Sequence, residues 1–376
     1  MHGLTHRPTP QRLRQPAIFL IPASITLGWL IYVLATSQLD RAIDNWESGA
    51  TMIFGSFLAG ATPAGAGGVA FPVFTKVLDT SAPVARTFSL SIQAIGMTCA
   101  AIIILLAHRP IEPRVIAAGI PAGLLGFFAA LLLLGEPENT FWPSSLSPAF
   151  IKTTFTIVLA AMALMMFMML RQPDLGGDRI PHWNARVWGG LILAAFLGGA
   201  ITAFTGTGVN IVVFLFVVVA GLHPHVGIPT SICIMAAISV AGFIALALLD
   251  GQFDIGLNPS GSQVISVDNQ PFGPVQSSRY DLLGLWLAAV PIVVWGAPLG
   301  TWVVHRLHED HLVKFIGTLA AVEVISTAVL VDDLHTEPAL IAYGIIGLTV
   351  ALSGIALLRR HRHKILSLPD DLALPG

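Results

Sequence analysis

Two glycine-rich segments interrupt long apolar stretches of the chain, and their residue types are suited to binding an anion. Glycine at this density ends a helix locally, so each segment is expected to separate two half-helices. A half-helix that begins at such a break directs free N–H groups and a partial positive charge at one place. Two such ends that meet form an anion site without a charged side chain. The first break contains Gly65, Ala66, Gly67 and Gly68, and the second contains Thr205, Gly206, Thr207 and Gly208.

Hydroxyl and amide side chains lie beside the breaks and at the start of the apolar segment after each one. They are neutral hydrogen-bonding groups that can complete the coordination of an oxyanion. Arg86, also in this region, either attracts anions or lies in the outer membrane interface. Two alternatives stay open: each hydroxyl bonds a carbonyl of its own helix, and the glycines serve close helix packing. Besides the breaks, the candidate substrate-binding residues are Arg86, Ser89, Gln93, Asn210, Thr230 and Ser231.

Glu323 is the acidic residue with the most unusual position. It lies in the middle of an apolar segment, and no other charged residue occurs in 315–331. A carboxyl at the bilayer centre costs about 2.5–3.5 kcal/mol on insertion scales, so its presence requires an explanation. Burial favours the protonated form, which would allow the group to exchange a proton. Glu323 is therefore either a proton-coupling residue or a structural acid that hydrogen-bonds a neighbouring helix.

The elements that must position these residues are membrane helices. The chain has 376 residues, of which 55% are hydrophobic and 11% charged, whereas soluble domains carry about 25% charged residues. Apolar runs of about 20 residues are long enough to cross a bilayer. They predict an all-α polytopic membrane protein with about eight transmembrane helices. The predicted spans are 16–35, 84–107, 115–134, 150–170, 226–249, 282–304, 314–331 and 338–358.

The two apolar stretches that contain the breaks, 51–78 and 187–221, are predicted to be re-entrant hairpins. Broken backbone at membrane depth is tolerated only where protein or water satisfies its polar groups. With eight crossings and two hairpins, both termini face the cytoplasm and most Lys and Arg residues lie on that side, as the positive-inside rule favours. Three crossings separate the hairpins, so the second copy is inverted relative to the first. Inverted repeats with broken helices are typical of secondary transporters.

This topology predicts a division of the chain into four parts. Residues 1–50 form an N-terminal tail, the first transmembrane helix and an outer loop. Repeat 1 covers 51–170, and repeat 2 covers 187–358. Repeat 2 contains a polar outer insertion at 251–280, which is either a lid or a solvated loop. Residues 359–376 form a basic cytoplasmic tail, which anionic lipid would attract.

A pattern of small residues occurs in both predicted repeats. The first copy has Gly60, Gly65, Gly67, Gly68 and Pro72, followed by Val84-Ala-Arg-Thr-Phe-Ser-Leu90, and the second has Gly198, Gly199, Thr205-Gly-Thr-Gly208 and Pro229-Thr-Ser231. This pattern resembles the signature of the TauE/SafE family of sulfite and organosulfonate exporters over most of residues 51–358. The sequence departs from it at Ala66, at Phe88 and at Val209-Asn210. The resemblance therefore implies the fold and leaves the particular substrate open.

The resemblance implies a secondary transporter in the bacterial inner membrane. It would export sulfite or an organosulfonate such as sulfoacetate by alternating access, with a proton as a potential coupling ion. The alternative is a passive anion channel whose re-entrant loops form the selectivity filter. The net charge of −2 provides no basic field for nucleic acid. No enzyme, cofactor or metal motif is found, so we expect no catalysis and no cofactor. Homodimerisation is left open.

Overall fold

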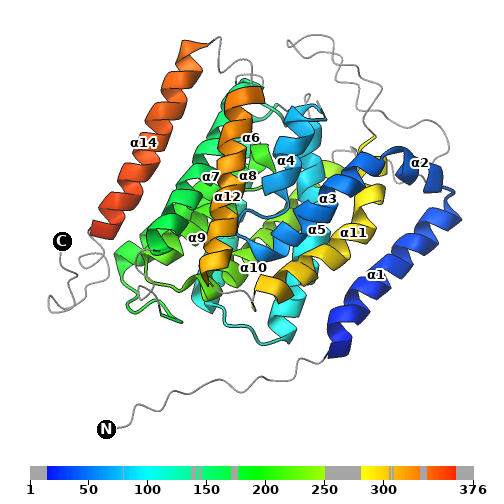
Figure 1. Ribbon diagram of the computed structural model, residues 1–376, viewed down its shortest axis with the longest axis horizontal. Coiled ribbons are helices and arrows are strands. Elements are labelled where there is room, and N and C mark those ends of the chain that lie inside the picture. Colours follow the sequence, from blue (N-terminus) through cyan, green and yellow to red (C-terminus); the bar gives the residue numbers. More distant parts are fainter. Residues whose placement is uncertain are drawn as a thin grey trace, which may run out of the picture.

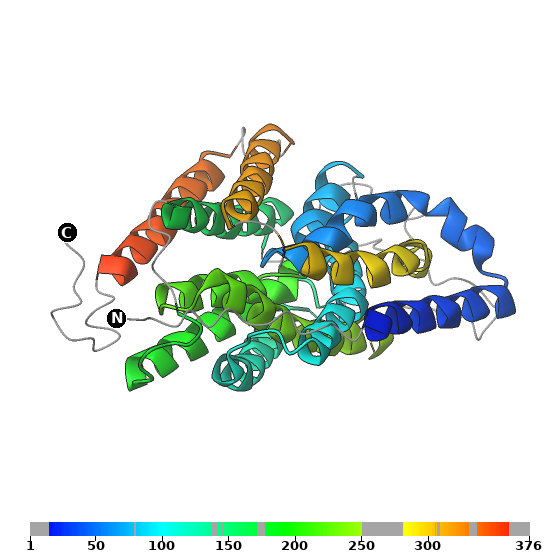
Figure 2. The ribbon, with the colours of Figure 1, turned by 60° about the horizontal axis from the view of Figure 1, so that its bottom comes forward.

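The protein is almost entirely helical in a computed structural model, which describes residues 15–78, 80–136, 141–143, 146–170, 177–249, 281–304, 306, 309–330 and 337–360. The helices are α1 (Gln15–Ala35), α2 (Leu39–Asp44), α3 (Trp46–Ala61), α4 (Gly67–Lys76), α5 (Ala82–Leu106), α6 (Pro113–Leu134), α7 (Pro148–Leu170), α8 (Ala185–Thr205), α9 (Val209–Val219), α10 (Pro224–Gly242) with its π-helical extension η2 (Phe243–Leu249), α11 (Leu282–Val304), α12 (Glu309–Leu330) and α14 (Pro338–Arg360). Figures 1 and 2 place α1 and α14 at opposite edges of the bundle. The insertion 251–280 and the tails 1–14 and 361–376 lie outside the described residues.

Seven helices in the described part of the chain are long and apolar enough to cross a membrane, which confirms a polytopic all-α membrane protein. They are α5, α6, α7, α8, α10 with η2, α11 and α14. One difference from the predicted hairpins concerns α8. This helix has 21 residues, as many as a full span needs, whereas the sequence suggested a half-helix. No glycine in α8 has a left-handed φ before Gly206, so its apolar run continues to the break.

Both apolar stretches are broken at the expected glycines. Helix α3 ends before Thr62, whose backbone is extended, and α4 begins five residues later. Helix α8 ends at Gly206 in the left-handed conformation, a common helix ending that favours glycine. Helix α9 then begins at Val209. The short helices α4 and α9 therefore both start at a break.

Helix packing is repeated in the two halves of the chain. The order α3–α4, α5, α6, α7 corresponds to the order α8–α9, α10, α11, α12. Helix α3 packs on α11 as α8 packs on α6, and α4 packs on α5 as α9 packs on α10. The corresponding helices α5 and α10 pack on each other, as do α7 and α12. This arrangement favours the predicted duplication, with α1, α2 and α14 as additions.

The contact between α3 and α11 is close enough to require glycine. A Cβ added to Gly60 would collide with the carbonyl oxygen of Ala297. A Cβ added to Gly300 would collide with the carbonyl oxygen of Phe57. Residues 57 and 60 on α3 therefore face residues 297 and 300 on α11, three positions apart on both helices. Small residues of this kind let membrane helices approach backbone to backbone.

The contact between α6 and α8 repeats this geometry residue by residue. A Cβ on Gly199 would collide with the carbonyl oxygen of Gly123, and one on Gly126 with the carbonyl oxygen of Phe196. Residues 196 and 199 on α8 thus face 123 and 126 on α6 with the same spacing of three. This matching packing also favours the predicted duplication.

Candidate functional site

The two breaks meet in the interior of the protein. Every residue from 58 to 72 and from 202 to 211 is buried. The Thr207 hydroxyl in the second break donates a hydrogen bond of 3.1 Å to the carbonyl oxygen of Ala64 in the first. A Cβ on Gly67 would lie 2.7 Å from the Cβ of Thr207. The N-terminal ends of α4 and α9 therefore approach the same place, and each contributes partial positive charge there.

Three glycines adopt backbone conformations that other residues rarely tolerate. The φ angles are +71° at Gly65, +75° at Gly206 and +154° at Gly208. A side chain at these positions would be strained regardless of the space available. Gly67 has no such angle, and its constraint is the contact with Thr207. The break glycines thus have two separate reasons to lack a Cβ: backbone conformation and close approach.

Gln93 on α5 connects its own helix to the second break. Its Nε2 group donates to the Gly206 carbonyl oxygen at 2.7 Å and to the Ser89 carbonyl oxygen at 3.0 Å. Because both partners are acceptors, the amide nitrogen faces the Gly206 and Ser89 carbonyl oxygens, and the Oε1 atom faces Gly65. A Cβ on Gly65 would lie 2.7 Å from that Oε1 atom.

Asn210, in the first turn of α9, is oriented in the complementary sense. Its Oδ1 atom accepts from the Gly208 N–H and from the Thr207 hydroxyl, both at 3.2 Å. The donor Nδ2 is therefore directed toward the first break, 2.9 Å from the point that a Cβ on Gly65 would occupy. An acceptor on Gln93 and a donor on Asn210 thus converge beside Gly65.

Polar atoms at this junction lack hydrogen-bond partners among the described residues. They are Gln93 Oε1, Asn210 Nδ2 and Ser89 Oγ, and all three side chains are fully buried. The large majority of buried polar groups in proteins are bonded, and leaving one unsatisfied costs about 1–3 kcal/mol. We refer to Gln93, Asn210, Ser89 and the two breaks as the junction site. Its unused donor, acceptor and hydroxyl are suited to a small polar ligand.

The remaining predicted residues take part unequally. Thr205 bonds the carbonyl oxygens of Ile201 and Thr207 within its own break. Ala66 and Gly68 are buried at the start of α4. Thr230 donates to the Val226 carbonyl oxygen and accepts from the Glu112 N–H. Ser231 donates to the Ile228 carbonyl oxygen. The hydroxyls of Thr230 and Ser231 are thus bonded away from the junction site.

Arg86 is fully buried, but its guanidinium is directed away from the breaks. It donates a hydrogen bond of 3.2 Å to the Phe141 carbonyl oxygen and lies 5.5 Å from the centre of the Trp142 ring. Only the backbone of Arg86 approaches Gly206, since a Cβ there would lie 2.7 Å from the Arg86 carbonyl oxygen. The side chain belongs to the contact between α5 and the segment that joins α6 to α7.

The backbone of Glu323 lies in the middle of α12, and its side chain is outside the described part of the structure. Three and four residues further along α12, the hydroxyls of Ser326 and Thr327 accept hydrogen bonds from Lys76 Nζ at 3.3 and 2.7 Å. Positions three and four apart share one face of a helix. Helix α12 therefore directs this face toward the C-terminal end of α4.

Sequence reasoning missed Thr202. Its hydroxyl accepts a hydrogen bond of 2.9 Å from the N–H of Val209 and donates to the Gly198 carbonyl oxygen. Thr202 thus satisfies the first N–H of α9 from across the break. The sequence does place Thr202 four residues before Gly206. A hydroxyl in the last turn of a helix can bond a backbone N–H beyond the helix end, so this spacing could have indicated its role.

A family model describes residues 48–327 of the chain, which include both breaks and all predicted binding residues; its description is Sulfite exporter TauE/SafE. The chain belongs to the TauE/SafE family. This agrees with the resemblance seen in the two glycine patterns, and membership implies a membrane transporter for sulfite or related sulfur-containing anions. The TauE/SafE match ends before α14, in agreement with the position of that helix at the edge of the bundle. No curated protein and no solved structure matches the chain.

Proposed function

We infer that this TauE/SafE protein exports small sulfur-containing oxyanions, sulfite or an organosulfonate such as sulfoacetate, across the bacterial inner membrane. The observation that carries the proposal is the junction site, where two helix N-termini and three unsatisfied polar atoms surround a glycine-lined point. The helix ends supply partial positive charge without a counter-charge that a substrate would have to displace. The anion would bind between Gly65, Gln93 and Asn210.

The polarity of the junction site favours an anion that carries a hydrogen-bond donor. Asn210 Nδ2 is a donor, the Ser89 hydroxyl can donate or accept, and Gln93 Oε1 accepts only. Hydrogensulfite has both oxygen acceptors and a proton to donate, whereas fully deprotonated sulfite would meet the Gln93 oxygen with a lone pair. We therefore propose the singly protonated anion as the preferred form of an inorganic substrate. An organosulfonate would place its sulfonate on the donors and a second group that carries a hydrogen-bond donor on Gln93; in sulfoacetate that group is the carboxyl in its protonated form.

Alternating access would follow from the repeated architecture. Repeat 1 (51–170) and repeat 2 (187–358), inserted in opposite orientations, would rock about the junction so that it opens to one side at a time. Both termini would then face the cytoplasm, and Glu323 would exchange the coupling proton. Homodimerisation stays a prediction.

Transport by purified protein in liposomes tests the proposal. Labelled sulfite or sulfoacetate should accumulate transiently when the vesicles are preloaded with the same unlabelled anion, because a carrier exchanges substrate. A passive channel with re-entrant selectivity loops would give flux down the gradient without this counterflow. Absence of saturable flux for either anion would contradict the proposed function, and flux without counterflow would favour the channel.

A further inference from the structure

A cavity of about 200 Å³ lies beside the first break. It lies between the C-terminal ends of α3, α5 and α11 and the N-terminal half of α10. The lining residues in the described structure are Gly60, Ile104, Arg109, Pro110, His225, Ile228, Pro229, Ile232, Thr301 and Val304. Drug-sized ligand pockets usually measure about 300–1,000 Å³, so this cavity suits a smaller ligand.

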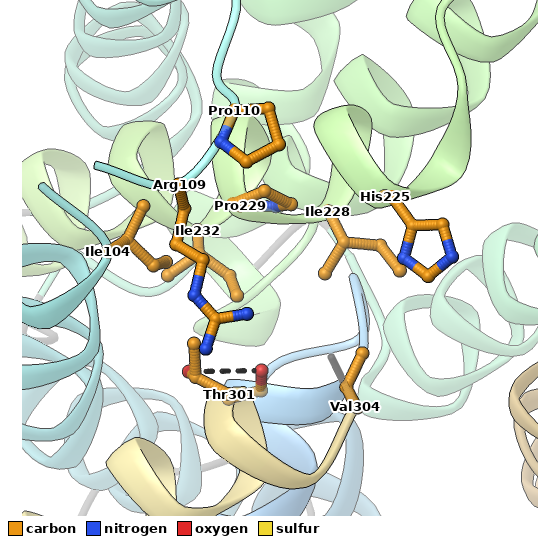
Figure 3. A pocket seen from close by; sticks show the side chains of 10 residues that line it. Ile104, Arg109, Pro110, His225, Ile228, Pro229, Ile232, Thr301 and Val304 are labelled. Atoms are coloured by element: carbon orange, nitrogen blue, oxygen red, sulfur yellow. Dashed lines mark hydrogen bonds between the residues drawn. The ribbon is translucent and has the colours of Figure 1, made fainter. Parts of the chain in front are cut away.

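Arg109 supplies the positive charge of this cavity. Figure 3 shows its side chain extending from the segment after α5 into the cavity, toward Thr301. No hydrogen bond or ion pair joins its guanidinium to another described residue, and none of the ten lining residues is acidic. Burial, followed by the like charge of Arg306, lowers the pKa of Arg109. A guanidinium in such surroundings gains from an anion that can form charge-assisted hydrogen bonds with it.

The cavity adjoins the end of α3 that leads into the first break. The Thr301 hydroxyl donates a hydrogen bond of 3.2 Å to the Gly60 carbonyl oxygen, as Figure 3 shows. Gly60 is in the last turn of α3, and Thr62 begins the first break two residues later. An anion held by Arg109 would therefore lie near Gly60, five residues before Gly65 of the junction site.

The positions in the other half of the protein that correspond to the cavity lining are also buried. By the repeat, Ile228, Pro229 and Ile232 on α10 correspond to Arg86, Thr87 and Leu90 on α5. Thr301 and Val304 on α11 correspond in the same way to Phe127 and Ala130 on α6. All five of these counterparts are buried, and the Arg86 guanidinium is covered by Trp142. The basic residue of that half, Arg86, therefore has partners there, whereas Arg109 extends into the cavity.

We propose that the cavity is the entry vestibule of the transporter and that Arg109 captures the substrate oxyanion there before it moves to the junction site. The proposal rests on the proposed function, and it assigns to Arg109 a role that the sequence did not indicate. Arg109 would be a binding residue for a small sulfite-like or sulfonate anion on the face that carries the segment between α5 and α6.

The test is transport of labelled sulfoacetate and sulfite by the full chain in liposomes, with the anion supplied at each face in turn. Arg109→Gln keeps a polar side chain, shorter than that of arginine, and removes its charge. We expect KM at the Arg109 face to rise about tenfold, with the maximal rate little changed, because uniform binding is lost. KM at the opposite face should not change. Arg109→Lys should retain most of the affinity.

Arg114→Gln is the matched control, because Arg114 stacks on Trp183 and does not line the cavity. A further variant, Arg109→Cys in a chain with Cys99→Ala and Cys233→Ala, allows the charge to be restored on a single folded protein. Modification with a trimethylammonium thiosulfonate should lower KM for sulfoacetate again, whereas a neutral methyl reagent should not. If the wild type transports the anion and Arg109→Gln has the wild-type KM at both faces, the vestibule proposal alone is overturned. Absence of wild-type flux would overturn the proposed function and the vestibule with it.

Discussion

The side-chain amide of Gln93 on α5 donates a hydrogen bond of 2.7 Å to the carbonyl oxygen of Gly206 in the second break. The same amide directs its oxygen at Gly65 in the first break. One side chain thus bonds the second break through its nitrogen and faces the first break with its oxygen. A movement of α8 and α9 relative to α5 would change this contact, so the geometry of the junction site depends on how these helices are packed.

Asn210→Asp should abolish high-affinity anion binding and leave the second break intact. The carboxylate retains the Oδ1 acceptor that bonds Gly208 N–H and Thr207, but it replaces the free Nδ2 donor with an acceptor and brings negative charge. Loss of a hydrogen bond to a charged ligand costs about 1.5–3 kcal/mol, which corresponds to about a tenfold to hundredfold rise in Kd. Isothermal titration of the purified protein with sulfite measures this change.

Asn184→Asp is the matched control for that substitution. Asn184 caps α8 outside the core, where its Oδ1 atom accepts from the N–H groups of Arg186 and Val187. Aspartate is an equally good cap, so anion affinity and stability should stay as in the wild type. Equal affinity of Asn210→Asp and the wild type would show that the junction site does not bind the anion.

Gly206→Ala should destabilise the protein by about 2 kcal/mol or more, because a left-handed φ costs a non-glycine residue about 1–2 kcal/mol. A Cβ there would also lie 2.6 Å from Ser89 Cβ and 2.7 Å from the Arg86 carbonyl oxygen. Gly189→Ala on α8 is the control, since nothing lies within 4 Å of its Cβ position. Thermal unfolding in detergent should show a lower Tm only for Gly206→Ala. Equal Tm values would mean that the break relaxes around a side chain.

Trp142→Ala should uncover the Arg86 guanidinium and increase passive anion leak. Trp142 is buried beneath Arg86 and packs edge-on against Phe204 near the end of α8. Trp183→Ala is the matched control, because Trp183 also lies against an arginine, Arg114, but in the segment before α8. Sulfite efflux from liposomes without exchangeable anion outside should rise for Trp142→Ala only. An unchanged leak would show that Arg86 and Trp142 do not seal the pathway.

Much of the fold could be predicted from the sequence, because apolar runs and glycine breaks are local signals. The site was only partly predictable, since hydrogen-bond partners distant in the chain decide the direction of each side chain. Thr230 meets Glu112 N–H across two helices, and Arg86 meets the loop before α7, so neither joins the junction. Gln93 and Asn210 belong to the junction site because α5 passes beside the second break and α9 begins at it. In the sequence Arg109 is one of many basic residues on the predicted cytoplasmic side, and only the packing of α10 and α11 places it in a cavity.

The predicted topology requires that the segments around Arg109 and Arg179 lie on the same, cytoplasmic, face. Cysteines introduced at the exposed positions His108 and Asp178, in a chain with Cys99→Ala and Cys233→Ala, should react in whole cells only with membrane-permeant thiol reagents. A cysteine at the exposed Leu39 in α2 should react with impermeant reagents as well. Reaction of both His108→Cys and Asp178→Cys with an impermeant reagent would reverse the orientation, and reaction of one alone would exclude the three-crossing arrangement between the hairpins.

Glu323→Gln should remove the dependence of transport on a pH gradient while substrate binding persists. Helix α12 packs on α7 and directs Ser326 and Thr327, on the turn after Glu323, to the ammonium group of Lys76 at the end of α4. Helix α4 has ten residues and begins at the first break. Helix α12 therefore contacts the opposite end of a helix that starts at the junction site. A carboxyl that gains and loses a proton in this position could bias how α4 is held. Glutamine keeps the shape and hydrogen-bonding capacity but cannot titrate, so counterflow at equal pH should continue and pH-driven accumulation should cease.

Glu337→Gln, at the exposed residue before α14, removes a carboxyl of the same type outside the membrane segment and should leave both activities unchanged. If pH-driven accumulation continues in Glu323→Gln, Glu323 is a structural acid and the coupling proton is carried elsewhere.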